Sequence, residues 1–528
     1  MRRFLYRLLF VVLIPLSLYS QNSNFTILCV AAHPDDEDGA TLAYYSKLKG
    51  YNAYTVFYTR GEGGQNEIGP ELYDELGKIR EQECYNAAEI QGSHPLFLGE
   101  LDFGFSKTAK ETFKMWGGKD SVLARIVYFI RLLRPDVVIS NHDTITTKPK
   151  RQHGNHQAVG ITIYDAFDKA ADPNYHTEQL TGGLTPWQIK KLYFRVFDTS
   201  KVNDVFTIDG SQKDASGKTI DDISWEALAQ HRTQGMDKID RYDIPSVFRE
   251  KRYELVRSDN MYPLEGNDLF AGLKPTEKLD LNGRLKSFPT VYKYITVNPQ
   301  DSLKLLKELK FNESANVGLV NSYDNTIENT LKAFGVKYEV LDSLHYANDD
   351  FKNFSVIIVD IRAYLYRQDV ARNNDKLIKF VEKGGNEICF YQKPQDWNGK
   401  NYTPDPIYIT SERVTEEDAK VTVLMPEHEF FNRYNKIEDN DWDGWVQERN
   451  IYLPSDDTSK TSVNYKKLLA MNDEDDPVPS TSLIVADPVG LGSYTYCSLA
   501  LYRQLKIFNK GALKLFLNMI SSRRRFIE

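Results

Sequence analysis

The chain has 528 residues, of which 41% are hydrophobic and 27% are charged. At roughly 100 to 200 residues per domain, this length predicts several globular domains and excludes a single small one. Lys and Arg number 66 against 74 Asp and Glu, which gives a net charge of −8. Because there is no basic excess to neutralise a phosphate backbone, nucleic acid is not an expected partner.

The first twenty residues indicate a secretory signal peptide. Arg2, Arg3 and Arg7 accompany an apolar run that ends in small or polar residues before Gln21. A membrane anchor is the alternative, but the apolar run at residues 8–18 is too short to span a bilayer and contains Pro15. We therefore expect an exported protein, periplasmic or secreted, with residues 1–20 removed and no stable membrane span in the mature chain.

Strands and helices are expected to alternate between residues 24 and 270. Residues 26–32 and 136–140 are short apolar runs typical of buried strands, and residues 52–59 form a third strand. Helical spacing of apolar residues predicts helices at 71–90 and 120–133. This order predicts an α/β domain with a parallel sheet, in which ligands bind where the carboxyl ends of the strands meet.

A second α/β domain is predicted at residues 301–528, after a linker at 271–300 that contains Gly283 and Pro289. Its strands and helices again alternate, with Gly335 expected to end one helix. The expected strands are residues 316–320, 354–361 and 387–391, and the expected helices are residues 326–334 and 375–382.

The motif His33-Pro34-Asp35-Asp36-Glu37 follows the first strand. A histidine followed three residues later by a carboxylate can place a nitrogen and an oxygen on one divalent ion, while Asp35 between them faces its open side. The alternative is a turn in which Asp36 or Asp38 caps the next helix. Capping alone does not require a histidine beside three successive acids, which repel one another unless a cation is present.

A second histidine motif, Gln152-His153-Gly154-Asn155-His156, follows the strand at 136–140. Two histidines three residues apart suit either two metal ligands or one ligand and one catalytic imidazole. The pattern by itself arises often by chance. Combined with the first motif, it supplies the third ligand of a His/Asp/His set with one open position, as catalytic zinc requires.

These motifs resemble those of the PIG-L/LmbE-like zinc-dependent de-N-acetylases. The resemblance covers about residues 24–260 and includes Thr59-Arg60-Gly61-Glu62-Gly63-Gly64 and Arg80-Glu81-Gln82-Glu83 as well as the two histidine motifs. It implies a Rossmann-like fold for the first domain. It also implies that one zinc ion per chain, or another divalent ion, acts in removing an acetyl group from an N-acetylated amino sugar or glycan.

The resemblance also assigns roles to individual residues. By it, His33, Asp36 and His156 would bind zinc, Asp35 would be the general base, and His153 would stabilise the tetrahedral intermediate. The residues that contact the sugar would be Arg80 and Asp102. Some members of the family have a tyrosine two residues before the first histidine of the second motif, but this chain has Arg151 there, and no such role is carried over.

Spacing on the predicted helix at 71–90 places Glu83 on its apolar stripe, with Arg80 at the edge. Arg80 therefore has two interpretations, a salt bridge to Glu83 or contact with a ligand. The TRGEGG segment lacks the spacing and the lysine of a phosphate loop, so it is interpreted as a turn in the pocket wall. His231 is as compatible with a structural role as with a functional one.

The second domain resembles the flavodoxin/amidotransferase-like α/β fold of class I glutamine amidotransferases. A catalytic member needs a nucleophilic cysteine on a sharp turn, whereas Cys389 lies within an expected strand, so this domain is predicted to be non-catalytic. The aromatic residues of 441–452 suit either sugar stacking or ordinary packing, and packing is favoured.

The motifs together predict an exported zinc hydrolase that removes the acetyl group of an N-acetylglucosamine-type sugar. One alternative is hydrolysis of another amide by the same site. A second alternative is a non-catalytic glycan-binding protein with a structural metal site, but an open coordination position argues against it, because structural zinc normally has four protein ligands.

Overall fold

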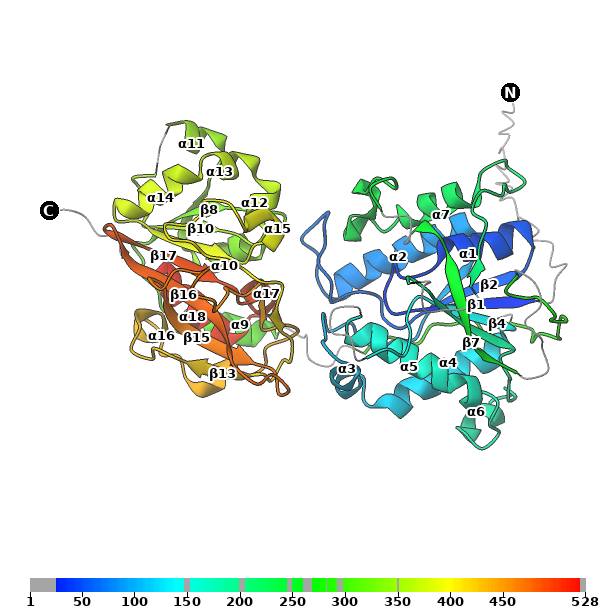
Figure 1. Cartoon of the computed structure of the whole chain (residues 1–528). Helices are drawn as coiled ribbons and strands as arrows, with labels where there is room; N and C mark the ends of the chain where they lie inside the picture. The colour runs from blue at the N-terminus through cyan, green and yellow to red at the C-terminus, as the bar shows by residue number, and fades with distance from the viewer. Residues whose placement is uncertain are drawn as a thin grey trace, which may run out of the picture.

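The computed structural model describes residues 25–146, 152–198, 205–244, 249–259, 268–281, 283–291, 298–348 and 351–522. The predicted signal peptide lies outside these residues. Figure 1 shows two α/β domains side by side, each built around its own sheet. No helix among the described residues is both long and apolar enough to cross a membrane.

The sheet of the first domain has the strand order β3-β2-β1-β4-β5-β7-β6 among the described residues. The strands β3, β2, β1, β4 and β5 are parallel, as predicted, whereas β7 pairs antiparallel with both β5 and β6. The sheet is therefore mixed at one edge. Strand β7 (RYELVRS) alternates charged and apolar residues and is half-exposed, which suits an antiparallel edge and not a strand covered on both faces. The strands are β1 Thr26–Ala31, β2 Asn52–Phe57, β3 His94–Phe97, β4 Val137–Ser140, β5 Lys191–Arg195, β6 Phe206–Thr207 and β7 Arg252–Ser258.

Helices cover both faces of this sheet (Figure 1). Helix α2 begins three residues later than predicted, because Tyr73 has a φ of 58°, outside helical geometry. Its buried side chains include Leu76, Arg80 and Glu83, so the predicted burial of Glu83 is confirmed. The helices are α1 Gly39–Ala43, η1 Tyr44–Leu48, α2 Asp74–Gln91, α3 Ala109–Met115, α4 Lys119–Leu133, α5 Gly154–Lys169, α6 Thr177–Thr181, α7 Ile220–Leu228, η3 Arg232–Gln234 and η4 Met236–Lys238.

The sheet of the second domain has the order β13-β15-β16-β17-β11-β10-β8-β9. Strands β9, β8, β10, β11 and β17 are parallel, and β17 continues into an antiparallel extension through β16, β15 and β13. A separate antiparallel pair joins β12 and β14. The strands are β8 Asn316–Val320, β9 Lys337–Val340, β10 Val356–Val359, β11 Asn386–Phe390, β12 Arg413–Val414, β13 Lys420–Val423, β14 Asn450–Ile451, β15 Lys466–Asn472, β16 Ser480–Val489 and β17 Gly492–Cys497.

The helices predicted in the second domain are present, and Gly335 ends α10 in the left-handed conformation with a φ of 68°. The domain also has several short helices that the sequence pattern did not indicate. The helices are α9 Pro299–Glu308, α10 Thr326–Phe334, α11 Ser343–Asn348, α12 Ala363–Tyr366, α13 Gln368–Arg372, α14 Asn374–Glu382, α15 Pro394–Trp397, α16 Glu429–Asn432, η5 Asp439–Trp442, α17 Leu501–Lys506 and α18 Lys510–Ile520.

Part of the segment predicted as a linker packs against the first domain. The backbone N–H of Phe288 donates to the carbonyl of Phe97, and the Lys278 ammonium lies 2.6 Å from the Asp136 carboxylate. Phe288 also packs against the apolar core beneath the sheet. Lys278 and Phe288 of this segment are therefore held against the first domain.

The two domains pack directly against each other. Leu72 and Tyr73, which precede α2 in the first domain, belong to the apolar core of the second domain. The Tyr73 hydroxyl donates to the carbonyl of Arg503 at 2.9 Å. The carboxyl ends of β10 and β11 meet the segment that follows β2, because Arg362 and Tyr391 both hydrogen-bond to Gln65.

Candidate metal and catalytic site

The turn after β1 places the side chains of Asp35, Asp36 and Asp38 in three different environments. Asp38 accepts from the backbone N–H of Thr41 and caps α1, which resolves the capping alternative in favour of Asp38. Asp36 instead folds back, so that its Oδ2 accepts from the backbone N–H of His33 at 2.9 Å. Asp35 has a φ of 84°, a left-handed conformation that turns the chain sharply between the two.

The Asp36 carboxylate lies among three imidazoles. Its Oδ2 is 3.1 Å from His33 Nδ1, 3.2 Å from His156 Nε2 and 3.6 Å from His142 Nε2. Burial disfavours the charged form, but His156 and His142 hold the pKa of Asp36 well below its usual range. An ionised carboxylate thus sits at the centre of this cluster.

His153 and His156 come from the start of α5. His153 is the N-cap position, and its ring centre is 3.8 Å from that of His156 and 5.2 Å from that of His33. Gly154 between them is required by close packing, because a Cβ there would lie 2.2 Å from the carbonyl oxygen of Thr108. The motif therefore places both imidazoles beside the HPDDE turn.

The donor set of this cluster fits a divalent metal ion. His33, His153 and His156 form one group of ligand atoms within 4.8 Å of one another, and Asp36, His142 and His156 form a second. The predicted ligands His33, Asp36 and His156 are divided between these groups, which share His156. His153 Nδ1 is buried without a hydrogen-bond partner among the described residues. Buried polar atoms are nearly always paired, so this nitrogen is suited to binding a group from outside the chain.

Metal binding needs neutral imidazoles, and the lowered pKa values of His153 and His156 meet this requirement. Burial lowers the pKa of His156 to about 4, and burial together with the neighbouring His156 and His33 lowers that of His153 well below its usual value. Burial lowers the pKa of His33, but the hydrogen bond that His33 donates to Asp36 and the negative charge of Asp102 raise it to about 9. His33 must therefore release a proton to bind a metal ion.

His142 is a member of the cluster that the sequence analysis did not single out. It follows β4, its Nε2 accepts from the backbone N–H of Ala32, and its ring stacks on His156 with 4.1 Å between centres. Its position directly after a buried strand, in Asn141-His142-Asp143, was the signal that could have identified it.

Arg80 does not form the salt bridge to Glu83 that is one of its two interpretations. Its guanidinium donates to the carbonyl of Gly61 at 2.5 Å, to that of Gln65 at 2.9 Å and to Thr233 Oγ1 at 3.1 Å. Glu83 accepts from the backbone N–H and the hydroxyl of Thr233 and is not paired directly with Arg80. Arg80 therefore holds the TRGEGG segment in place, and its contact with a substrate stays a prediction.

Asp102 lies close to the cluster and is 4% exposed. Its Oδ1 accepts from the backbone N–H of Gly104 at 2.9 Å. A Cβ at Gly63 would lie 2.6 Å from the same oxygen, so the TRGEGG segment packs directly on Asp102. The sequence prediction that this segment forms a wall beside the site agrees with this packing.

His231 has a supporting position. It is fully buried, and its Nε2 is 2.9 Å from Glu37 Oε1, the last acid of the HPDDE motif. Of the two interpretations left open by the sequence, this contact favours a structural role, because the imidazole orients a carboxylate that neighbours the cluster.

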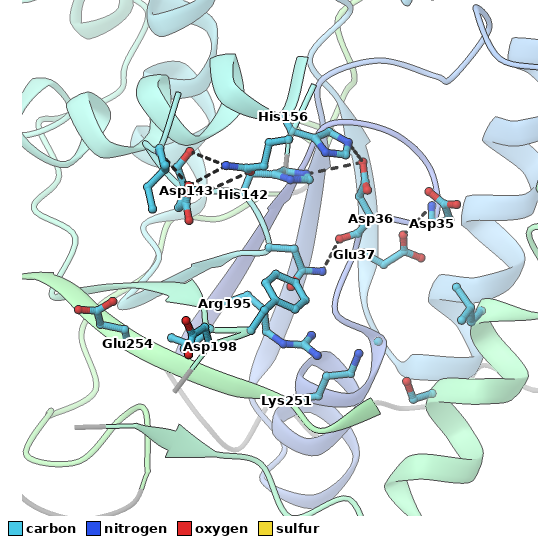
Figure 2. Close-up of a pocket in the computed structure, with 18 of the residues that line it drawn as sticks. Asp35, Asp36, Glu37, His142, Asp143, His156, Arg195, Asp198, Lys251 and Glu254 are labelled. Carbon is cyan, nitrogen blue, oxygen red and sulfur yellow. Dashed lines mark hydrogen bonds and ion pairs between the residues drawn. The ribbon is translucent and has the colours of Figure 1, made fainter. Parts of the chain in front are cut away.

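A cavity of about 690 Å³ opens beside the cluster (Figure 2). Asp35, Asp36, His142 and His156 line one end (Figure 2). The other end is lined by Arg195, the last residue of β5, and Lys251, which immediately precedes β7. Burial and the adjacent Asp36 carboxylate raise the pKa of Asp35 to about 7. A carboxylate with a pKa near neutrality, facing a cavity beside a metal-ligating cluster, is suited to general base catalysis.

Known proteins resemble the first domain. A family model described as GlcNAc-PI de-N-acetylase, PIG-L, matches residues 28–167. The 1D-myo-inositol 2-acetamido-2-deoxy-alpha-D-glucopyranoside deacetylase of Rhodococcus jostii is 31% identical over 192 residues, which cover 33% of this chain and 62% of that protein. The second such deacetylase of Saccharopolyspora erythraea is 30% identical over 285 residues, which cover 47% of this chain and 100% of that protein.

Among solved structures, N,N'-diacetylchitobiose deacetylase from Pyrococcus horikoshii aligns with a TM-score of 0.35 and 20% identity, over 44% of this chain and 84% of that one. The chain thus spans less than two thirds of the Rhodococcus relative and the whole length of the Saccharopolyspora relative.

Proposed function

Since this chain belongs to the PIG-L family of de-N-acetylases, we propose that its first domain hydrolyses the N-acetyl group of an N-acetylglucosamine-type sugar or glycan. The observation that carries the proposal is the ionised Asp36 among His33, His142 and His156, with Asp35 facing the adjoining cavity. The substrate class follows from the relatives, which act on a 2-acetamido-2-deoxyglucoside.

The proposed metal is zinc, which suits a set of imidazole and carboxylate donors. His33, Asp36 and His156 would hold it, and His142, whose ring stacks on that of His156, lies beside them. When bound, the metal polarises the amide carbonyl and lowers the pKa of a water molecule.

Side chains of the protein would carry out the proton transfers. Asp35 would take a proton from the attacking water, whose oxygen adds to the carbonyl carbon of the acetamido group. His153, kept neutral by burial, would donate its N–H to the developing oxyanion. The C–N bond then breaks, and the proton held by Asp35 passes to the leaving amine, so that acetate and a free amino sugar result.

The second domain is proposed to be non-catalytic. Cys389 lies inside β11, is fully buried, and burial raises the pKa of its thiol well above the usual value. A buried thiol in a strand is neither ionised nor accessible, which supports the view that an amidotransferase-like fold is used here without amidotransferase chemistry. Export also remains a proposal, supported by the pattern of residues 1–20.

The test is an acetate-release assay of the purified chain on N-acetylglucosamine, its oligomers and peptidoglycan fragments. Acetate should be released from at least one of these, a chelator should abolish the release, and added zinc should restore it. If metal is bound at about one ion per chain but no acetate is released from any of them, the site serves another amide or has only a structural role.

A further inference from the structure

The loop at residues 102–106 of the first domain connects His153 to the second domain. The ring centre of Phe105 in this loop is 5.3 Å from that of His153. The guanidinium carbon of Arg413, in β12 of the second domain, lies 4.7 Å from the centre of the same Phe105 ring. An arginine of the second domain thus contacts the ring that packs on His153.

The orientation of the His153 ring depends on packing. Its Nδ1 has no hydrogen-bond partner in the described part of the chain, and its side chain makes no capping bond to α5. An imidazole that acts in catalysis is commonly oriented by a hydrogen bond to one of its nitrogens. Here the rings of His156, His33 and Phe105 surround it, with centres 3.8, 5.2 and 5.3 Å away. His33 and His156 are candidate metal ligands, whereas Phe105 needs a support of its own.

Arg413 is suited to holding the Phe105 ring in place. A guanidinium group stacks well on aromatic faces, because it is planar and attracted to the electron-rich face of the ring. The Arg413 guanidinium also lies 5.5 Å from the ring centre of Tyr452 in the second domain. Arg413 therefore joins an aromatic ring of each domain.

Glu448 fixes the position of Arg413. Its Oε1 accepts from Arg413 Nη1 at 2.6 Å, and its side chain is 2% exposed. Its Oε2 lies 3.5 Å from Arg503 Nη2. A Cβ at Gly104, where φ is 90°, would lie 3.0 Å from the same Oε2, so the Glu448 carboxylate packs on the loop backbone directly beside Phe105.

The backbone of the loop is held separately by the first domain. The carbonyl of Ser106 accepts from the backbone N–H of Gly154 at 2.8 Å, and the Ser106 hydroxyl donates to Asn155 Oδ1 at 2.9 Å. These contacts do not involve the second domain. Loss of Arg413 should therefore release the Phe105 ring while the loop backbone and the metal ligands stay in place.

We propose that Arg413 of the second domain is a positioning residue for His153 and acts through Phe105. The contacts lead from the buried Glu448 through Arg413 and Phe105 to the imidazole. This role depends on the proposed function, which assigns the developing oxyanion to His153. It gives a domain without catalytic groups of its own a part in the chemistry of the first domain.

The first test is steady-state kinetics of acetate release by the full chain, with the substrate found in the acetate-release assay. Arg413→Met should lower kcat about ten-fold, because a displaced oxyanion donor stabilises the transition state less. KM and metal content should not change. Arg413→Lys keeps a cation beside the Phe105 ring and should recover part of kcat. The matched control, Arg433→Met, breaks an ion pair to Glu429 within the second domain and should leave kcat unaltered.

A double-mutant cycle tests whether Arg413 acts through Phe105. Phe105→Leu removes the aromatic ring, so Arg413→Met should have little further effect on kcat in that background. Additive losses would overturn the proposal, as would full kcat of the single Arg413→Met variant. A raised KM with unchanged kcat would also overturn it, because Arg413 would then contact the substrate.

Thermal unfolding separates positioning from a loss of fold. Arg413→Met removes one partner of the buried Glu448 carboxylate and should lower Tm. The double variant Arg413→Met/Glu448→Gln removes the buried charge as well and should restore Tm without restoring kcat. Recovery of kcat together with Tm would show that Arg413 serves only the fold, and would overturn the proposal.

Chemical modification tests the positioning without measuring deacetylation. Diethyl pyrocarbonate reacts with histidine nitrogens, and mass spectrometry measures the rate at His153. Arg413→Met should raise this rate several-fold, because the Phe105 ring no longer holds the imidazole, and should not change the rate at His345 in the second domain. An unchanged rate at His153 would overturn the proposal. If the wild type releases no acetate but the rate at His153 rises, the proposed function is wrong and the positioning of His153 by Arg413 stands.

Discussion

Asp35 and Asp36 are adjacent in the chain but face different partners. Asp36 is held within hydrogen-bonding distance of His33 and His156, whereas Asp35 lines the cavity. The left-handed φ of Asp35 sends the two carboxylates in different directions. Their roles should therefore separate by mutation.

Asp35→Asn should retain the metal and lose on the order of 10²-fold in kcat, the usual contribution of a general base. Asparagine tolerates a left-handed φ, so the turn should survive the change. Asp36→Asn should instead lose metal, and excess zinc should restore part of its activity. Metal content measured beside kcat checks both changes. Rescue of Asp35→Asn by zinc would assign Asp35 to the metal and leave the base unidentified.

Glu387 shows how burial alone raises the pKa of a carboxyl group. It is fully buried in β11, neither carboxylate oxygen has a partner among the described residues, and burial raises its pKa to about 8. In the unfolded chain the pKa is about 4.3. The folded state therefore binds a proton that the unfolded state releases between these two values, and stability should fall as the pH rises through this window.

Glu387→Gln removes this titration while keeping the shape of the side chain. The difference in the free energy of unfolding, variant minus wild type, should rise with pH between pH 5 and pH 8. The rise should be at most about 1.4 kcal/mol per pH unit. Urea denaturation at several pH values measures it. A difference that does not change with pH would mean that the Glu387 carboxyl titrates normally.

At the scale of elements, the segment after β2 connects the second domain to the candidate site. Arg362, which follows β10, donates to Gln65 Oε1 at 2.8 Å and to Glu67 Oε1 at 2.7 Å, and Tyr366 also donates to Glu67. The backbone carbonyl of Gln65 in turn accepts from Arg80. The segment that packs on Asp102 is thus held from the second domain.

Arg362→Met should lower kcat/KM for deacetylation about ten-fold, because small displacements of positioned groups are costly to catalysis. The matched control is Arg372→Met, at an exposed position on α13. A double-mutant cycle with Glu67→Gln should be strongly non-additive, since the two residues are in direct contact. Additive effects, or full activity of Arg362→Met, would show that the contact does not support the site.

At the scale of the whole molecule, Leu72 anchors one domain in the core of the other. It is 4% exposed and packs within the apolar cluster of the second domain. Leu72→Ala should lower the free energy of unfolding by about 2–5 kcal/mol, measured by urea denaturation. Leu344→Ala, at a leucine that is 65% exposed, should change it by less than about 0.5 kcal/mol. Equal effects of the two changes would contradict the anchoring role.

The two-domain α/β organisation and the main strands and helices followed from the sequence by itself. Short apolar runs such as residues 26–32 are typical of strands buried on both faces, and a glycine such as Gly335 ends a helix through its local backbone freedom. These are effects of neighbouring residues, so local patterns predict them. The motifs around His33 and His153 were recognisable for the same reason, because each lies on one continuous turn.

Only the tertiary structure decided which side chains meet. It added His142 to the cluster, turned Arg80 toward Gly61 and Gln65 in place of Glu83, and placed β7 antiparallel between β5 and β6. It also brought Arg362 to Glu67, almost 300 positions away in the chain. Such contacts depend on how distant elements pack, and local periodicity carries no information about a partner on another element. Chemistry could thus be predicted within each motif, whereas the assembly of the site required the fold.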